Sequence, residues 1–203
     1  MGAFLLYRKL LLTLKTDVLK CLEQIKRKGP SQIRSYFGGN EMKVLEKNGQ
    51  VIEGNFDNKE VKEAFWHTSA HVLAQAVKRL YPDTKCAIGP AIDNGFYYDF
   101  DFSFPFTEEN LAAIEKEMKK IVKQSLPLEV FEVKKEEALS YMKERQEDYK
   151  VEMIEELPED ETITFYKQGD YEEFCAGPHV SNTCVIKAIK LLSTAGAYWR
   201  GDE

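Results

Sequence analysis

The sequence predicts an α+β fold, a two-layer mixed domain in which helices pack against a largely antiparallel sheet. Two hairpin signals indicate antiparallel pairing: Asn48-Gly49 and Asp93-Asn94-Gly95, each with strand-like stretches on both sides. Apolar residues recur with a helical period over about residues 61–81 and 107–124, which predicts the helical layer.

Residues 1–41 are predicted to be a basic leader or a peripheral helix that ends near Gly29-Pro30. Residues 1–40 carry eight lysines and arginines against two acids, although the whole chain of 203 residues has a net charge of −6. The first charges lie within the apolar run rather than before it, so an organellar presequence is a better alternative than a secretory signal. A third hypothesis makes Met42 the true start, because residues 38–42 can be encoded as a ribosome-binding site followed by ATG.

The elements after this leader follow in order. Residues 42–60 form a short strand pair or linker, and residues 61–203 form the main domain. The first helix runs from about Val61 to Tyr81 and stops before Pro82. Its apolar stripe consists of Trp66, Ala70, Leu73, Val77 and Leu80. One strand face of the next hairpin carries Phe96, Tyr98, Phe100 and Phe102.

Thr107 is expected to cap the second helix, which has a core side and a solvent side. The core side carries Leu111, Ile114, Met118 and Ile121, and the solvent side carries Lys116, Lys119, Lys120 and Lys123. We interpret the lysines as a solvated face paired with Glu115 and Glu117, with nucleic-acid contact as the alternative. A strand at 128–133, a helix at 135–147 and strands at 162–167 and 183–192 complete the prediction.

The composition excludes several classes of protein. No run approaches the ~20 apolar residues that span a bilayer, so no membrane association is expected. The four cysteines form no CxxC pair, which favours a reducing compartment and a cytoplasmic location. The acidic net charge argues against a protein that coats nucleic acid through bulk charge.

The candidate chemistry lies with the three histidines of the chain. His67 and His71 are four residues apart on a predicted helix, and His179 follows Cys175 at the same spacing. Three imidazoles and a thiolate are acceptable tetrahedral Zn²⁺ ligands. A metal-free hydrolytic pocket, in which imidazoles hold and activate water, is the second interpretation.

Three segments resemble a known family, namely FWHTSAHVLAQAVKRLYPDTKCAIGPAIDNGFYYDFD, YKQGDYEEFCAGPHV and KLLSTAGAYWRGDE. They are similar to the editing domain of bacterial threonyl-tRNA synthetases, whose wider relatives include the alanyl editing domains and free-standing trans-editing proteins. The resemblance runs from about residue 60 to Glu203, and CAGPH and AYWRGDE favour the threonyl branch. It implies an aminoacyl-tRNA deacylase that removes serine wrongly attached to threonine tRNA. Such editing is needed because one missing methyl group gives a synthesis pocket only ~1–3 kcal/mol of discrimination.

The resemblance also implies a set of site residues. His67 and Glu173 would position or deprotonate water, and Lys150 would favour the developing oxyanion. The amino acid or the terminal adenosine would be held by His71, Tyr98, Cys175 and His179. Two positions depart from the family, Glu173 where aspartate is usual and Ala176 where arginine is common. The longer side chain could misplace a water-activating group, and the loss of arginine removes one contact to phosphate.

The threonyl branch is thought to work without a metal, so no bound metal is favoured. If zinc is present, its expected ligands are His67, His71, Cys175 and His179.

The chain stops where the class II catalytic core of the family would begin, so ligase activity is not expected from this chain alone. The expected partner is threonine tRNA mischarged with serine, with a separate synthetase chain as a further partner. The alternatives are a free-standing, zinc-dependent alanyl-type trans-editing protein and an inactive binding remnant.

Overall fold

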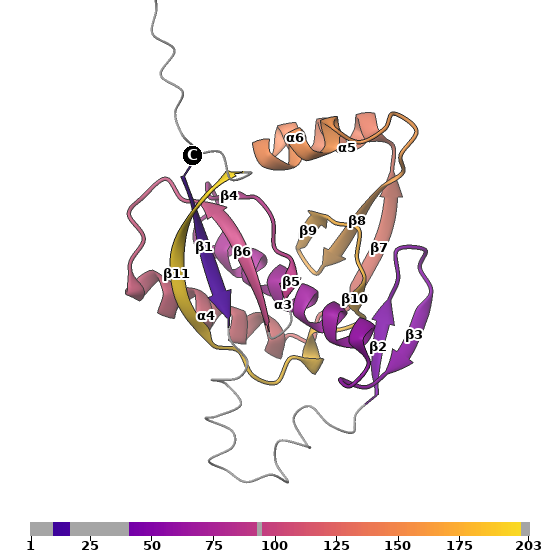
Figure 1. Cartoon of the computed structure of the whole chain (residues 1–203), viewed down its shortest axis with the longest axis horizontal. Coiled ribbons are helices and arrows are strands. Elements are labelled where there is room, and N and C mark those ends of the chain that lie inside the picture. Colours follow the sequence, from indigo (N-terminus) through magenta and orange to yellow (C-terminus); the bar gives the residue numbers. More distant parts are fainter. Residues whose placement is uncertain (1–9, 17–40, 93–94, 200–203) are drawn as a thin grey trace, which may run out of the picture.

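The computed structural model describes residues 10–16, 41–92 and 95–199 (Figure 1). Its strands form antiparallel pairs in three small sheets, and helices cover them. The predicted α+β class with largely antiparallel sheets is therefore confirmed. Within the described residues, no helix combines the length and the apolar composition needed to cross a membrane.

The largest sheet has the order β11-β1-β6-β4, and β5 also pairs with β6. Its strands are β1 (Leu10–Thr16), β4 (Lys85–Cys86), β5 (Ala91–Ile92), β6 (Gly95–Asp101) and β11 (Leu191–Tyr198). Helices α3 (Lys59–Leu80) and α4 (Glu108–Lys123) lie behind this sheet in Figure 1. The hairpin expected at residues 93–95 is present as the β5–β6 pair, with Ile92 opposite Gly95, although residues 93–94 lie outside the described part.

The two smaller sheets contain three strands each and include most of the strands from the second half of the chain. One has the order β10-β2-β3, from β2 (Met42–Leu45), β3 (Val51–Gly54) and β10 (His179–Val180). The other has the order β7-β8-β9, from β7 (Leu128–Val133), β8 (Ile163–Gln168) and β9 (Tyr171–Phe174). Two short helices, α5 (Lys135–Glu144) and α6 (Asp148–Glu155), lie between β7 and β8 in the chain.

The core is centred on α3, which is buried on most of its surface rather than along one stripe. Four of the five stripe residues are buried, whereas Leu80, at the end of the helix, is 37% exposed. The reason is that α3 contacts β6, β10 and α4 on different sides. By contrast, α4 has one buried face, formed by Ile114, Met118 and Ile121 as predicted, whereas the fourth predicted core residue, Leu111, is only partly buried.

The first segment differs from the expected peripheral helix. Residues 10–16 form β1, an inner strand paired with β11 on one side and β6 on the other. The sequence LLLTLKT repeats leucine at positions 10, 12 and 14, a period-two pattern that a helical interpretation of the leader overlooks. The remaining leader residues, 1–9 and 17–40, lie outside the described part, so the presequence and Met42-start hypotheses stay predictions.

Three further boundaries differ from the predictions. The helix expected at 135–147 is two helices, because Gln146 adopts a positive φ of 58° between α5 and α6. The strand expected at 183–192 is a 3₁₀ turn (Thr183–Val185) followed by β11. The stretch before the second hairpin is interrupted between β4 and β5, where Pro90 lacks a backbone donor.

Candidate functional site

Five elements bring the seven predicted site residues together. Helix α3 carries His67 and His71, and β6 carries Tyr98. Helix α6 carries Lys150, and the segment from β9 to β10 carries Glu173, Cys175 and His179. The contacts described below join all seven, so a cluster inferred from three distant parts of the sequence is a single site in space.

The Cys175 sulfur lies at the centre of the imidazole cluster. Its Sγ is 3.2 Å from His67 Nε2 and 3.2 Å from His179 Nε2, and the backbone N–H of Gly177 donates to it at 3.3 Å. The three imidazole rings also contact one another, with centroid separations of 4.1–5.2 Å. The thiol is therefore enclosed by two ring nitrogens and one backbone donor.

The tautomer of His179 follows from its hydrogen bonds. The Thr68 hydroxyl donates its proton to the Ala64 carbonyl at 2.8 Å and accepts the Val180 N–H at 3.0 Å. His179 Nδ1, 3.1 Å from the same hydroxyl oxygen, must then be the donor. We assign the proton of His179 to Nδ1, which leaves Nε2 as an acceptor facing Cys175.

Burial keeps the cluster uncharged. It lowers the pKa of His71 to about 3, although Glu173 opposes the shift, and it lowers the pKa of His67 and, more strongly, of His179. Burial also raises the pKa of the Cys175 thiol to about 12. At neutral pH the site thus presents three neutral imidazoles and a thiol rather than a thiolate.

The only buried carboxylate among the predicted site residues, Glu173, is fully engaged by donors. Its Oε1 accepts hydrogen bonds from the Lys150 ammonium at 2.6 Å and from the Tyr98 hydroxyl, and its Oε2 accepts one from the Tyr171 hydroxyl at 2.6 Å. Burial is the largest single influence and would raise the pKa of Glu173, but the Lys150 charge, His71 and the hydrogen bonds from Lys150 and Tyr171 together outweigh it and lower that pKa to about 2. The same pairing raises the pKa of Lys150 against the effect of burial. A carboxylate with this low pKa is a weak base, so its geometry suits positioning better than proton abstraction.

A cleft of about 690 Å³ opens beside this cluster. His67, Lys150 and Cys175 line it, whereas His71, Tyr98, Glu173 and His179 lie behind them and do not. The remaining wall is largely apolar and includes Trp66, Ile88, Ile92 and Met153. Ala176, at the position where arginine is common in the family, also lines the cleft and is exposed.

Two glycines are required by close packing around the site. A Cβ at Gly89, in the cleft wall, would meet the Tyr98 ring at 2.1 Å. Gly177 has a φ of +66°, and a Cβ there would meet the Tyr166 hydroxyl at 2.2 Å. These glycines let Tyr98 and the segment from Cys175 to His179 approach their neighbours.

The donor set could hold a metal ion. One ligand atom from each of His67, His71, Cys175 and His179 lies within 4.8 Å of all the others. The Thr68–His179 hydrogen bond is the kind of outer contact that orients metal-binding imidazoles. These nitrogens and the sulfur match the ligands that zinc prefers, so the residues fit Zn²⁺.

Sequence reasoning missed two residues that hold the site in place, Tyr171 and Thr68. Tyr171 donates to Glu173, and Thr68 orients His179. Thr68 directly follows His67 in HTSAH, and Tyr171 lies two residues before Glu173 in YEEFC. Proximity in sequence was thus the available signal, but no spacing rule identifies which hydroxyl group faces inward.

Comparison with known proteins relates this chain to the aminoacyl-tRNA synthetases. Residues 163–203 match the family model described as the threonyl and alanyl tRNA synthetase second additional domain. This match covers β8 to β11 and includes Glu173, Cys175 and His179.

The relatives found are threonine–tRNA ligases. The one from Clostridium tetani is 65% identical over 162 residues, 80% of this chain and 25% of its own length. Those from Caldanaerobacter subterraneus subsp. tengcongensis and Acetivibrio thermocellus are 60% and 61% identical, over 78% and 73% of this chain. The resemblance to bacterial threonyl-tRNA synthetases is therefore confirmed. The chain spans about a quarter of the length of the curated relatives it matches.

Proposed function

We propose that this domain hydrolyses the ester that joins serine to the terminal ribose of threonine tRNA. The observation that carries the proposal is that a neutral imidazole, His67, and an ammonium group, Lys150, line the same cleft. Hydrolysis of an ester needs a group that holds or deprotonates water and a positive group near the developing oxyanion. These two side chains supply both.

In this mechanism His67 holds the attacking water and accepts its proton as the oxygen adds to the ester carbonyl. When the bond between the carbonyl carbon and the ribose oxygen breaks, His67 returns this proton to the departing ribose oxygen, which leaves free serine and deacylated tRNA. Its neutral state, which burial favours, is the state in which it can act as a base. Lys150 stabilises the negative charge that develops on the carbonyl oxygen. Glu173 holds the Lys150 ammonium at 2.6 Å, and Lys150 lines the cleft.

Selection of serine would be steric. A packed wall can reject the extra methyl group of threonine by overlap, whereas hydrogen bonds to a hydroxyl group cannot, because both amino acids carry one. The acceptor end would enter along the apolar wall that contains Ile88 and Ile92, both exposed at 37% and 44%. Exposed apolar side chains of this kind suit the face of a nucleobase.

The test is deacylation of serylated and threonylated threonine tRNA by the purified chain. We expect serine to be released and threonine to be spared. Equal rates on both substrates would refute the steric selection, and no release of either would favour the inactive binding remnant. The chain spans only about a quarter of the length of its threonine–tRNA ligase relatives. We therefore also propose that it edits tRNA charged by a threonine–tRNA ligase core, which lies either in the same polypeptide or in a second one.

The alanyl-type trans-editing function remains the second candidate, because His67, His71, Cys175 and His179 fit zinc. Bound there, zinc would supply Lewis-acid chemistry or a structural link between α3 and the segment that follows β9. A closed set of four protein ligands is typical of structural rather than catalytic zinc. Metal analysis of the purified chain and an assay with serylated alanine tRNA separate this candidate from the first.

A further inference from the structure

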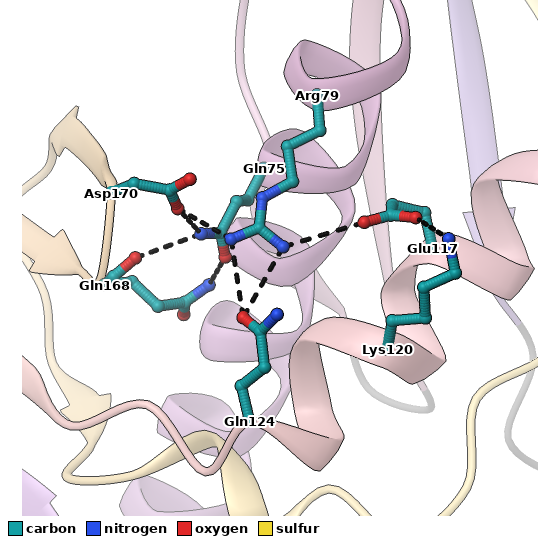
Figure 2. A network of polar contacts seen from close by, with 7 residues as sticks. All are labelled: Gln75, Arg79, Glu117, Lys120, Gln124, Gln168 and Asp170. Atoms are coloured by element: carbon teal, nitrogen blue, oxygen red, sulfur yellow. Dashed lines mark hydrogen bonds and ion pairs between the residues drawn. The ribbon is translucent and has the colours of Figure 1, made fainter.

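The face of α3 that carries the site histidines continues beyond them. Gln75 and Arg79 follow His71 at successive intervals of four residues, so all three project from one side of the helix. Figure 2 shows that both side chains point toward the turn between β8 and β9 and the end of α4. Their partners there are Gln168, Asp170, Gln124 and Glu117.

Gln75 and Gln168 form a buried amide pair. Gln75 Nε2 donates to the Gln168 carbonyl at 3.1 Å and to Asp170 Oδ1 at 2.6 Å, and Gln168 Nε2 donates back to Gln75 Oε1 at 2.6 Å. The two side chains are 1% and 0% exposed. A buried amide that loses its hydrogen bonds is costly, and although Gln168 Oε1 has no partner among the described residues, the three bonds above favour one placement of the turn against α3.

Arg79 forms the outer part of the same network. It contacts Asp170 at 2.8 Å, Gln124 at 3.4 Å and Glu117 at 3.6 Å. Asp170 is exposed over 66% of its side chain, so solvent and salt screen its ion pair with Arg79. The outer contacts therefore constrain the turn less than the buried pair does.

The turn between β8 and β9 is linked to the site by a short, tightly paired hairpin. Only two residues, Gly169 and Asp170, separate β8 from β9, and Gly169 takes the positive φ of 64° that a tight hairpin turn requires. Gln168 pairs with Tyr171, and the Tyr171 hydroxyl donates to Glu173. A displacement of the turn relative to α3 would move Glu173 with respect to Lys150 and to His71, whose Nε2 lies 3.9 Å from it.

We propose that Gln75 and Gln168 are positioning residues for the hydrolytic site. Neither side chain lines the cleft. Their amide pair fixes the hairpin that carries Glu173 against the helix that carries His67 and His71, and so holds the Lys150 ammonium where the oxyanion forms. This inference rests on the proposed deacylase function.

The test compares Gln75→Met, which keeps the length of the side chain, with the control Arg79→Gln, which removes only the outer contacts. On serylated threonine tRNA we expect Gln75→Met to lower kcat about 10-fold with KM within about twofold, because small displacements of catalytic groups act on the chemical step. Arg79→Gln should stay within about twofold of wild type. Wild-type kcat in a folded Gln75→Met would overturn the proposal, as would an equal loss in both variants.

A second readout does not depend on activity. The chain has three histidines, so the ¹⁵N spectrum of its imidazole groups at one fixed pH is simple to assign. Gln75→Met should shift the His71 signals and Arg79→Gln should not, whereas unchanged His71 signals in Gln75→Met would overturn the proposal. An inactive wild type would refute the deacylase function, and this spectrum would still decide the positioning. If Gln75→Met does not fold, the double variant Gln75→Met/Gln168→Leu, in which no amide is left unpaired, replaces it in both measurements.

Discussion

The buried Lys150–Glu173 ion pair allows stability and chemistry to be separated in one experiment. Both side chains are at most 8% exposed, and their charged atoms are 2.6 Å apart. Lys150→Met removes the charge and leaves the Glu173 carboxylate buried with its two tyrosine donors. We expect the free energy of unfolding to fall by about 3 kcal/mol, the lower end of what an uncompensated buried charge costs.

The lowered pKa of Glu173 gives a similar size for the loss in the free energy of unfolding. In the folded chain it is lowered from its ordinary value of 4.5 to about 2. A carboxyl group whose folded pKa is depressed contributes stability above its unfolded pKa, here roughly 3 kcal/mol at neutral pH. For a chain of this size such a loss corresponds to a fall in Tm of roughly 6–12 °C.

The double variant Lys150→Met/Glu173→Gln removes both charges and decides between the two roles. We expect urea unfolding to return to within about 1 kcal/mol of wild type, since replacing both partners of a buried pair is often nearly neutral. Serine deacylation should stay at least about 10²-fold below wild type, because the group that stabilises the oxyanion is still missing. Additive stability losses in the double variant, or near wild-type activity in either variant, would refute this reasoning.

Three further predictions concern other parts of the domain. His67→Ala should lower serine deacylation by about 10²-fold while circular dichroism is unchanged, and a wild-type rate would remove His67 from the mechanism. Gly89→Ala should lower the free energy of unfolding by about 1–3 kcal/mol in urea, because its Cβ would meet the Tyr98 ring at 2.1 Å; an unchanged midpoint would contradict that packing. Neutralising Lys119 and Lys120 should leave the salt dependence of tRNA binding unchanged, because both are already paired within α4, and a flatter slope would instead show phosphate contacts.

The pairing of these two lysines agrees with the interpretation of the α4 surface as a solvated, ion-paired face, and contact with tRNA stays a prediction for the salt-dependence measurement. Lys119 pairs with Glu115 at 2.5 Å and Lys120 with Glu117 at 2.7 Å. Both pairs are three or four residues apart, so helical geometry alone was sufficient to predict them. Local patterns of this kind are the most reliable part of a prediction from sequence.

The sequence alone determined features that depend on local patterns and on segment similarity. The periodicity of α3 and α4, the two hairpins and the α+β class follow from side-chain spacing and turn residues, which act over a few residues. The resemblance to the editing domain indicated His67, Lys150 and Cys175 as site residues, and the structure brings them to one cleft. Whether they catalyse hydrolysis stays a prediction for the experiments above.

Only the tertiary structure decided how those residues are held and which of them face the cleft. The placement of β1 inside a sheet depends on pairing with β6 and β11, more than 75 residues away, which no local pattern reports. The depressed pKa of Glu173 depends on Lys150, His71 and Tyr171, from α6, α3 and β9. Burial and long-range electrostatic contact arise only when distant segments pack together, and they give the identified residues their charge states.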